Sequence, residues 1–70
     1  MSEQEFLEKM KNILDEETVR MEDYLYDFDG WDSISMMSFY LSEVKKTDKK
    51  VSLISFRNVE TVKDLYELMK

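Results

Sequence analysis

The stretch Gly30-Trp31-Asp32-Ser33-Ile34 divides an acidic segment from an apolar one and marks the start of a helix. Asp is a residue type that caps helix N-termini, because its carboxylate accepts hydrogen bonds from backbone N–H groups of the first turn. Gly30 is the only glycine of the chain and offers the backbone freedom that a sharp entry into a helix requires. We therefore expect a helix from Ser33 to about Lys46.

Ser33 places a hydroxyl at the N-terminus of this expected helix. Unpaired backbone N–H groups and the positive end of the helix dipole favour an anion at such a position. A phosphate-linked prosthetic group attached to Ser33 would therefore lie in a favourable field. Asp32 and Ser33 before an apolar run also have the pattern of an ordinary capping pair. Attachment site and cap both stay open as interpretations of this pair.

The expected second helix carries an unusually wide apolar band. One stripe is formed by Ile34, Met37, Leu41 and Val44, with Met36 and Tyr40 beside it. A helix that buries a single face does not need so many apolar side chains. Part of the band is therefore expected to be exposed for a partner, with ordinary core packing as the alternative.

An earlier helix is expected from Glu3 to about Asp15. Ser2 and Glu5 have the spacing of a capping box, in which each side chain bonds the backbone of the other residue. The apolar residues that follow at helical spacing are Phe6, Met10 and Ile13, joined by Leu7 and Leu14. This periodicity is typical of an amphipathic helix.

The acidic segment between these two helices is expected to pack across them as a long loop. It contains Met21, Tyr24, Leu25 and Phe28, which is too much apolar surface for a flexible linker. These four residues also fit helical spacing, so a short helix within the segment stays possible.

Two more helices are expected towards the C-terminus. A short one is expected near Leu53 to Asn58, because the apolar run there has no second strand to pair with. A last one should run from Thr61 to about Met69, since Thr61 and Asp64 repeat the spacing of a capping box. The chain has no proline and no linker-like stretch. We therefore predict one all-α domain over residues 1–70, a small four-helix bundle with a short third helix.

The composition excludes several classes of chemistry. The chain has no cysteine and no histidine, which removes thiolate nucleophiles, Cys/His zinc sites and the commonest general base. We therefore expect no catalytic or metal site, and Ser33 would need an external enzyme to react. The acidic N-terminal residues, without a basic region or a long apolar run, predict neither secretion nor a membrane span. A cytoplasmic location is the expectation.

The charge is unevenly distributed along the chain. Residues 1–32 hold 3 basic and 11 acidic residues, a net charge of −8, whereas residues 33–70 hold 7 basic and 5 acidic ones, a net charge of +2. An acidic balance argues against nucleic acid as a partner, because phosphate binding uses clustered Lys and Arg. The basic cluster of Lys45, Lys46, Lys49 and Lys50 is interpreted as a solvated helix end.

This order of elements resembles the acyl carrier and peptidyl carrier protein family over nearly the whole chain. The family's Asp-Ser-Leu/Ile attachment motif corresponds to Asp32-Ser33-Ile34. Its recurring Thr-Val-x-Asp-Leu motif corresponds to Thr61 through Leu65, at a compatible separation. The resemblance implies an acyl-carrier-like bundle that acts as a monomer.

The resemblance also implies a cofactor and partners. Ser33 would accept 4′-phosphopantetheine from coenzyme A, delivered by a phosphopantetheinyl transferase that needs Mg²⁺. The group would carry acyl or aminoacyl units as thioesters between loading and downstream biosynthetic enzymes. Asp32 would help present Ser33 to the transferase. Ile34, Met37 and Leu41 occupy the positions where the family's second helix meets its enzymes; for these three, core packing is the alternative.

The chain departs from the family's fatty-acid-type members on its second helix. Those carriers bear acidic residues along this helix, whereas here Glu43 stands among Ser35, Ser38, Val44, Lys45 and Lys46. We therefore expect a specialised pathway that makes a polyketide, a peptide-like product or a modified lipid. A second hypothesis is a helical interaction module that keeps the carrier fold and leaves Ser33 unmodified.

Overall fold

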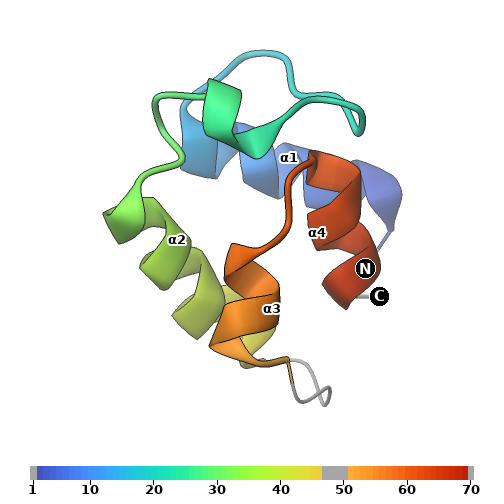
Figure 1. The fold of residues 1–70 in the computed structure, drawn as a ribbon. Helices are drawn as coiled ribbons and strands as arrows, with labels where there is room; N and C mark the ends of the chain where they lie inside the picture. Colours follow the sequence, from blue (N-terminus) through green and yellow to red (C-terminus); the bar gives the residue numbers. More distant parts are fainter. Residues whose placement is uncertain (1, 47–50, 70) are drawn as a thin grey trace.

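The computed structural model describes residues 2–46 and 51–69 and contains four α-helices in them (Figure 1). These helices are α1 (Glu3–Leu14), α2 (Ser33–Phe39), α3 (Leu53–Arg57) and α4 (Val62–Met69). Two further helical turns are η1, a 3₁₀ turn over Leu25–Asp27, and η2, a π-helical turn over Tyr40–Val44. Within these residues the only β-type pairing is an isolated bridge between Tyr24 and Thr61. The predicted all-α fold with four helices and a short third helix is confirmed.

The start of α1 has the predicted capping box. Ser2 Oγ accepts a hydrogen bond from Glu5 N–H at 3.1 Å, and Glu5 Oε1 accepts one from Ser2 N–H at 3.4 Å. α1 ends at Leu14, because Asp15 takes the left-handed conformation with φ 56° and ψ 47°. Asp is one of the few non-glycine types that adopt this conformation readily. The helix is therefore one residue shorter than expected.

The long loop that follows is bound to the start of α4 by backbone hydrogen bonds. Lys63 N–H donates to Met21 O at 2.8 Å, Val62 N–H donates to Asp23 O at 2.9 Å, and Leu25 N–H donates to Glu60 O at 2.8 Å. The loop therefore lies across the bundle, as expected (Figure 1). Only Leu25–Asp27 in it is helical, as a single 3₁₀ turn.

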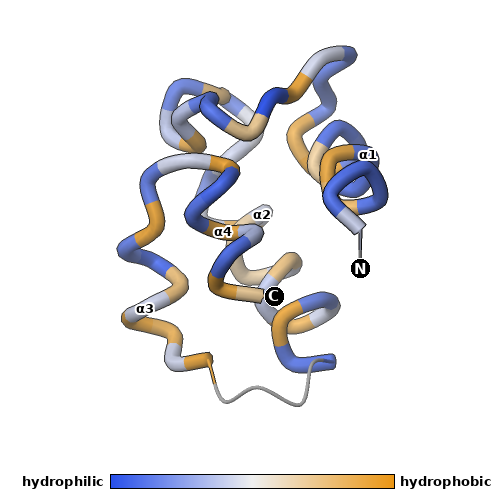
Figure 2. The backbone as a smooth tube through the Cα atoms, turned by 90° about the vertical axis from the view of Figure 1, so that its right-hand side faces the viewer, coloured by the Kyte–Doolittle hydropathy of each residue, from blue (hydrophilic) through white to orange (hydrophobic). Residues whose placement is uncertain are grey.

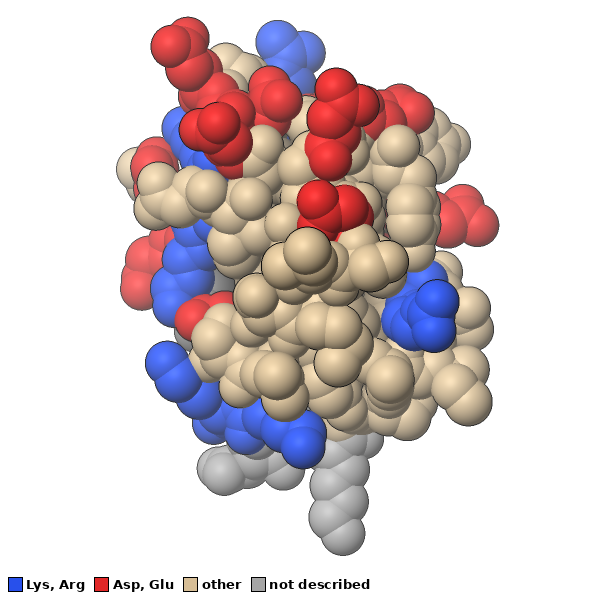
Figure 3. All heavy atoms as spheres, turned by 90° about the vertical axis from the view of Figure 1, so that its left-hand side faces the viewer, with Lys and Arg blue, Asp and Glu red and all other residues tan. Residues whose placement is uncertain are grey.

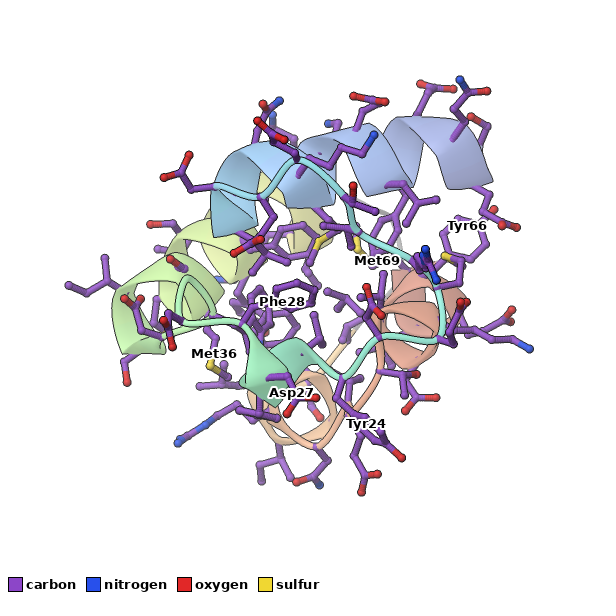
Figure 4. All side chains as sticks on the ribbon, turned by 90° about the horizontal axis from the view of Figure 1, so that it is seen from above. Tyr24, Asp27, Phe28, Met36, Tyr66 and Met69 are labelled. Atoms are coloured by element: carbon purple, nitrogen blue, oxygen red, sulfur yellow. The ribbon has the colours of Figure 1, made fainter. Side chains whose placement is uncertain are left out.

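Apolar residues of the loop pack it against the core of the bundle. Val19 and Leu25 are buried, and Phe28 packs against the same core. Figure 4 looks down on the loop and shows Phe28 directed towards the interior, and Met36 of α2 packs against the same core. The interpretation of this segment as a packed loop rather than a flexible linker is confirmed.

The second helical segment changes its geometry halfway. α2 ends at Phe39 and continues without a break as η2, in which Lys45 N–H bonds Tyr40 O at 3.1 Å. The wider π turn lets Phe39 and Val44, five residues apart, both face the core. Helical geometry stops at Val44, two residues before the expected end. Lys45 and Lys46 follow as an exposed turn, whereas Lys49 and Lys50 lie outside the described residues.

Aromatic rings make up the centre of the core between α2, α3 and the loop. Phe39 and Phe56 are stacked, with ring centroids 6.1 Å apart and planes at 11°. Trp31 meets Phe39 edge-on at 6.1 Å, and Tyr40 tilts against Phe56 at 5.2 Å. Such offset and edge-on pairs add stabilisation to that of burial alone. The buried apolar residues are Phe6, Met10, Leu14, Val19, Leu25, Trp31, Phe39, Val44, Phe56, Val59, Val62 and Leu65.

The two C-terminal helices begin at side-chain caps. Ser52 Oγ accepts a hydrogen bond from Ser55 N–H at 3.1 Å at the start of α3. Before α4, Thr61 Oγ1 accepts one from Asp64 N–H at 3.0 Å, and Asp64 Oδ2 accepts one from Thr61 N–H at 3.2 Å. The predicted pairing of Thr61 with Asp64 is therefore confirmed. None of the helices described here is long and apolar enough to cross a bilayer.

Candidate functional site

Asp32 closes the N-terminus of α2. It has an extended backbone, with φ −109° and ψ −179°, and its Oδ1 accepts a hydrogen bond from Ser35 N–H at 2.8 Å. This hydrogen bond from the Ser35 backbone lowers the pKa of the Asp32 carboxyl below its ordinary value, because it stabilises the charged form. Asp32 is therefore a fully formed N-cap.

Ser33 is the first residue of α2 and is exposed to solvent. Within the described parts of the chain, its hydroxyl makes no hydrogen bond to another residue. The cap is made by Asp32 alone, so capping does not account for the Ser33 hydroxyl. The side chain is free to meet a reactant from solvent.

Gly30 fits its position for a different reason from the one the sequence suggested. Its φ does not lie in the positive region, so the turn requires no glycine-only backbone. A Cβ on Gly30 would instead lie 2.5 Å from the carbonyl oxygen of Leu14. The entry into α2 therefore packs directly against the C-terminal end of α1. Close backbone approach, not conformational freedom, excludes a side chain here.

Two adjoining hollows open beside Ser33, between α2 and α3. One has a volume of about 580 Å³ and is lined by Tyr26, Trp31, Asp32, Ser33, Met36, Ile54, Arg57 and Asn58. The other, of about 150 Å³, is lined by Ser33, Met36, Met37, Leu53, Phe56 and Arg57. Ser33, Met36 and Arg57 border both. The hydroxyl therefore stands at the rim of a surface depression that a flexible group could enter.

The far wall of this depression is held by a long-range hydrogen bond. The hydroxyl of Tyr26, in the loop, donates to the carbonyl oxygen of Arg57 at 2.9 Å. This bond joins the loop to the C-terminal end of α3. Trp31 lines the depression but is only 4 % exposed as a residue, and its indole N–H is buried without a partner in the described structure. Trp31 is therefore a core residue.

Beside the depression lies an exposed apolar face. Ile34 is 79 % exposed, Leu41 57 % and Met37 42 %, and Ile54 of α3 is 74 % exposed. Core packing, the alternative interpretation for Ile34, Met37 and Leu41, is therefore wrong. The expected stripe divides, because its fourth member, Val44, is buried while these three are exposed. We call Ile34, Met37, Leu41, Leu53 and Ile54 the α2–α3 face.

Figure 3 views the molecule from the side of α2. Side chains without charge cover the middle of this view, and acidic side chains gather towards the loop at the top. Figure 2 shows α3 as a largely hydrophobic segment at the edge of the molecule. An apolar area bordered by charge on one side is the composition of a protein-binding surface.

The sequence predicted Asp32, Ser33, Ile34, Met37 and Leu41, and the structure places them all on the first three turns of one helical segment. The sequence did not predict that α3 and the loop also contribute to this site, through Tyr26, Leu53, Ile54 and Arg57. The apolar character of the third-helix segment was the available signal, since only Phe56 in it is buried.

Metal-binding residues are not gathered anywhere in residues 2–46 and 51–69, where no group of three or more His, Cys, Asp or Glu could hold an ion. Comparisons of the chain with family models, with curated proteins and with solved structures found no match.

Proposed function

We propose that the chain is a carrier protein that holds acyl or aminoacyl intermediates as thioesters on a 4′-phosphopantetheine arm attached to Ser33. The observation that carries the proposal is the exposed Ser33 hydroxyl, which takes no part in the cap that Asp32 forms with Ser35. The two motifs of the sequence, Asp32-Ser33-Ile34 and Thr61 through Leu65, support the same function by their resemblance to the carrier family.

The residues around Ser33 suit such a group. The hydroxyl is accessible to a transferase, and the depression beside it offers space of about 580 Å³ in which a flexible arm can lie. The chain has no cysteine, and the thiol needed to carry a thioester would be supplied by the arm. Asp32 would hold the start of α2 in place while Ser33 reacts.

Attachment would transfer the phosphopantetheinyl group from coenzyme A to Ser33. Ser33 Oγ would form a bond to the coenzyme A phosphorus that bears pantetheine. The bond from that phosphorus to the bridging oxygen of the diphosphate breaks, and the adenosine nucleotide leaves with this oxygen. No base among the described residues accepts a hydrogen bond from Ser33 Oγ, so the transferase would accept the proton.

The α2–α3 face would be the surface on which partner enzymes dock. Met37, Leu53 and Ile54 of this face line the hollows that Ser33 borders, so an enzyme seated on the face would have the arm within reach. The acidic first half of the chain would attract basic partners over a longer distance and raise the association rate. The pathway would be a specialised one, with a cytoplasmic location and a monomeric carrier.

The test is intact-mass measurement after incubation with coenzyme A, Mg²⁺ and a transferase of broad specificity. The proposal predicts a gain of one phosphopantetheine per chain. Ser33→Ala should abolish the gain, whereas Ser38→Ala, which removes another exposed hydroxyl from α2, should not. Circular dichroism establishes that both variants are folded.

A second candidate function is an interaction module that binds a partner through the α2–α3 face and leaves Ser33 unmodified. The exposure of Ile34 and Ile54 favours it as much as it favours a carrier. The same experiment separates the two, because an interaction module would keep its mass unchanged.

A further inference from the structure

Among the described residues, a single cationic residue borders both hollows beside Ser33. Arg57, the last residue of α3, lines the 580 Å³ hollow and the 150 Å³ hollow alike. The other charged residue that lines the larger hollow in the described part of the chain is Asp32. Arg57 and Ser33 come from different helices and lie 24 positions apart in the sequence, so the fold brings them to the same depression.

The backbone of Arg57 is fixed while its side chain is not engaged. Its carbonyl oxygen accepts the hydrogen bond from Tyr26, and the next residue, Asn58, donates its N–H to Ile54 O at 3.1 Å. Across the described residues, the guanidinium of Arg57 makes neither an ion pair nor a hydrogen bond. An anion entering the depression would therefore meet a cation without a competing partner.

The negative charge of Asp32 makes a nearby cation favourable for a phosphodiester on Ser33. A phosphodiester on Ser33 would carry a negative charge next to the Asp32 carboxylate, which is ionised at neutral pH and already committed to the cap. Two neighbouring negative charges repel each other unless a cation lies close to them. A guanidinium matches phosphate oxygens with two parallel N–H donors, and it keeps its charge at every physiological pH.

We propose that Arg57 is a positioning residue that pairs with the phosphodiester on Ser33 and holds the first part of the arm in the depression between α2 and α3. This inference rests on the proposed function, because it requires that Ser33 be modified. The arm would then start along α3, and the exposed side chains of Ile34 and Leu41 would be left uncovered for a partner enzyme.

The test uses the wild-type chain labelled with ¹⁵N, before and after loading, with loading followed by intact mass. The chain has two arginines, so its side-chain Nε–H spectrum contains Arg57 and one internal control, Arg20 of the loop. Pairing predicts that the Arg57 Nε–H signal shifts on loading and that the Arg20 signal does not. A complete gain in mass with an unmoved Arg57 signal would overturn the pairing and leave the carrier function standing.

Phosphorus NMR of the loaded protein supplies a second readout that a purely structural role would not move. Arg57→Gln should shift the phosphodiester resonance away from its wild-type position, because the cation is lost. Arg57→Lys should shift it less, and the matched control Arg20→Gln should leave it unchanged. Identical ³¹P positions in wild type and Arg57→Gln would refute the pairing. A chain that gains no mass at all would instead refute attachment at Ser33.

Discussion

Gly30 lies so close to Leu14 that a Cβ on the glycine would come within 2.5 Å of the leucine carbonyl oxygen. This close contact holds the segment just before Asp32 and Ser33, the start of α2, against the end of α1. The neighbouring atom belongs to the backbone, so it cannot move aside as a flexible side chain would. We expect Gly30→Ala to lower the free energy of unfolding by about 1–3 kcal/mol, the usual cost of overpacking. Urea denaturation measures the change.

Ser38→Ala, on the exposed side of α2, serves as the control for that measurement and should leave the stability nearly unchanged. Equal stability of Gly30→Ala and wild type would show that α1 and the start of α2 are not in this contact.

The hydroxyl of Tyr40 provides a second test of the packing. It donates to the carbonyl oxygen of Val51 at 2.9 Å in a partly buried position, while the ring rests against Phe56. Tyr40→Phe keeps the ring and removes the hydrogen bond, so the unfolding free energy should fall by about 0.5–1.5 kcal/mol. Tyr24→Phe is the matched control, because the exposed hydroxyl of Tyr24 makes no hydrogen bond in the described residues. An equally large loss of stability in Tyr24→Phe would contradict a stabilising hydrogen bond between Tyr40 and Val51.

The cap at the start of α4 predicts a dependence on pH. Hydrogen bonds from the backbone N–H groups of Thr61 and Glu60 lower the pKa of the Asp64 carboxyl below its ordinary value of 3.8. A carboxyl whose pKa is lower in the folded state stabilises the fold above the unfolded pKa, and this contribution disappears as the pH falls through the folded pKa. Wild type should therefore exceed Asp64→Asn in stability at pH 7.

This stability difference should be constant above about pH 5 and should shrink as the pH is lowered through and below 3.8. Urea denaturation of both proteins over that pH range measures it. A difference that is the same at both ends of the range would mean that the charge of Asp64 does not contribute to the cap.

The capping pairs at the starts of α1 and α4 were predictable from the sequence, because each of them joins residues three positions apart. Ser2 with Glu5 and Thr61 with Asp64 were identified by that spacing, and both pairs are formed. Helix starts depend on such local contacts, so the starts of all four described helices could be placed to within one residue.

What the sequence did not predict depends on contacts between distant segments. The apolar band of α2 did not indicate which of its residues would be buried, because this is decided by where α1 and α3 pack against it. The π turn after Phe39 has no signature in the periodicity, and the steric reason for Gly30 is a neighbour on α1. Arg57 and Ser33 likewise line the same hollows although they are 24 positions apart in the sequence, and the Tyr26 bond to the end of α3 is another contact between distant segments.

Ile34 offers a test of the α2–α3 face. Its side chain is 79 % exposed, so Ile34→Ser should leave the unfolding free energy nearly unchanged. If the transferase docks on this face, kcat/KM for loading should fall by about fivefold or more, because truncating an interface anchor costs at least about 1 kcal/mol. Tyr24→Ser, an apolar-to-polar change at a residue 56 % exposed on the loop, is the control and should load normally. Equal loading rates for Ile34→Ser and wild type would place the docking surface elsewhere.

The most direct test of the central claim is to find which residue carries the group after reaction with coenzyme A and a transferase. Cleavage after Arg20 and Lys45 releases a peptide that holds Ser33 together with Ser35, Ser38 and Ser42, so tandem mass spectrometry must assign the site within it. The account predicts one phosphopantetheine, on Ser33. An unmodified peptide, or the group on one of the other three serines, would contradict it.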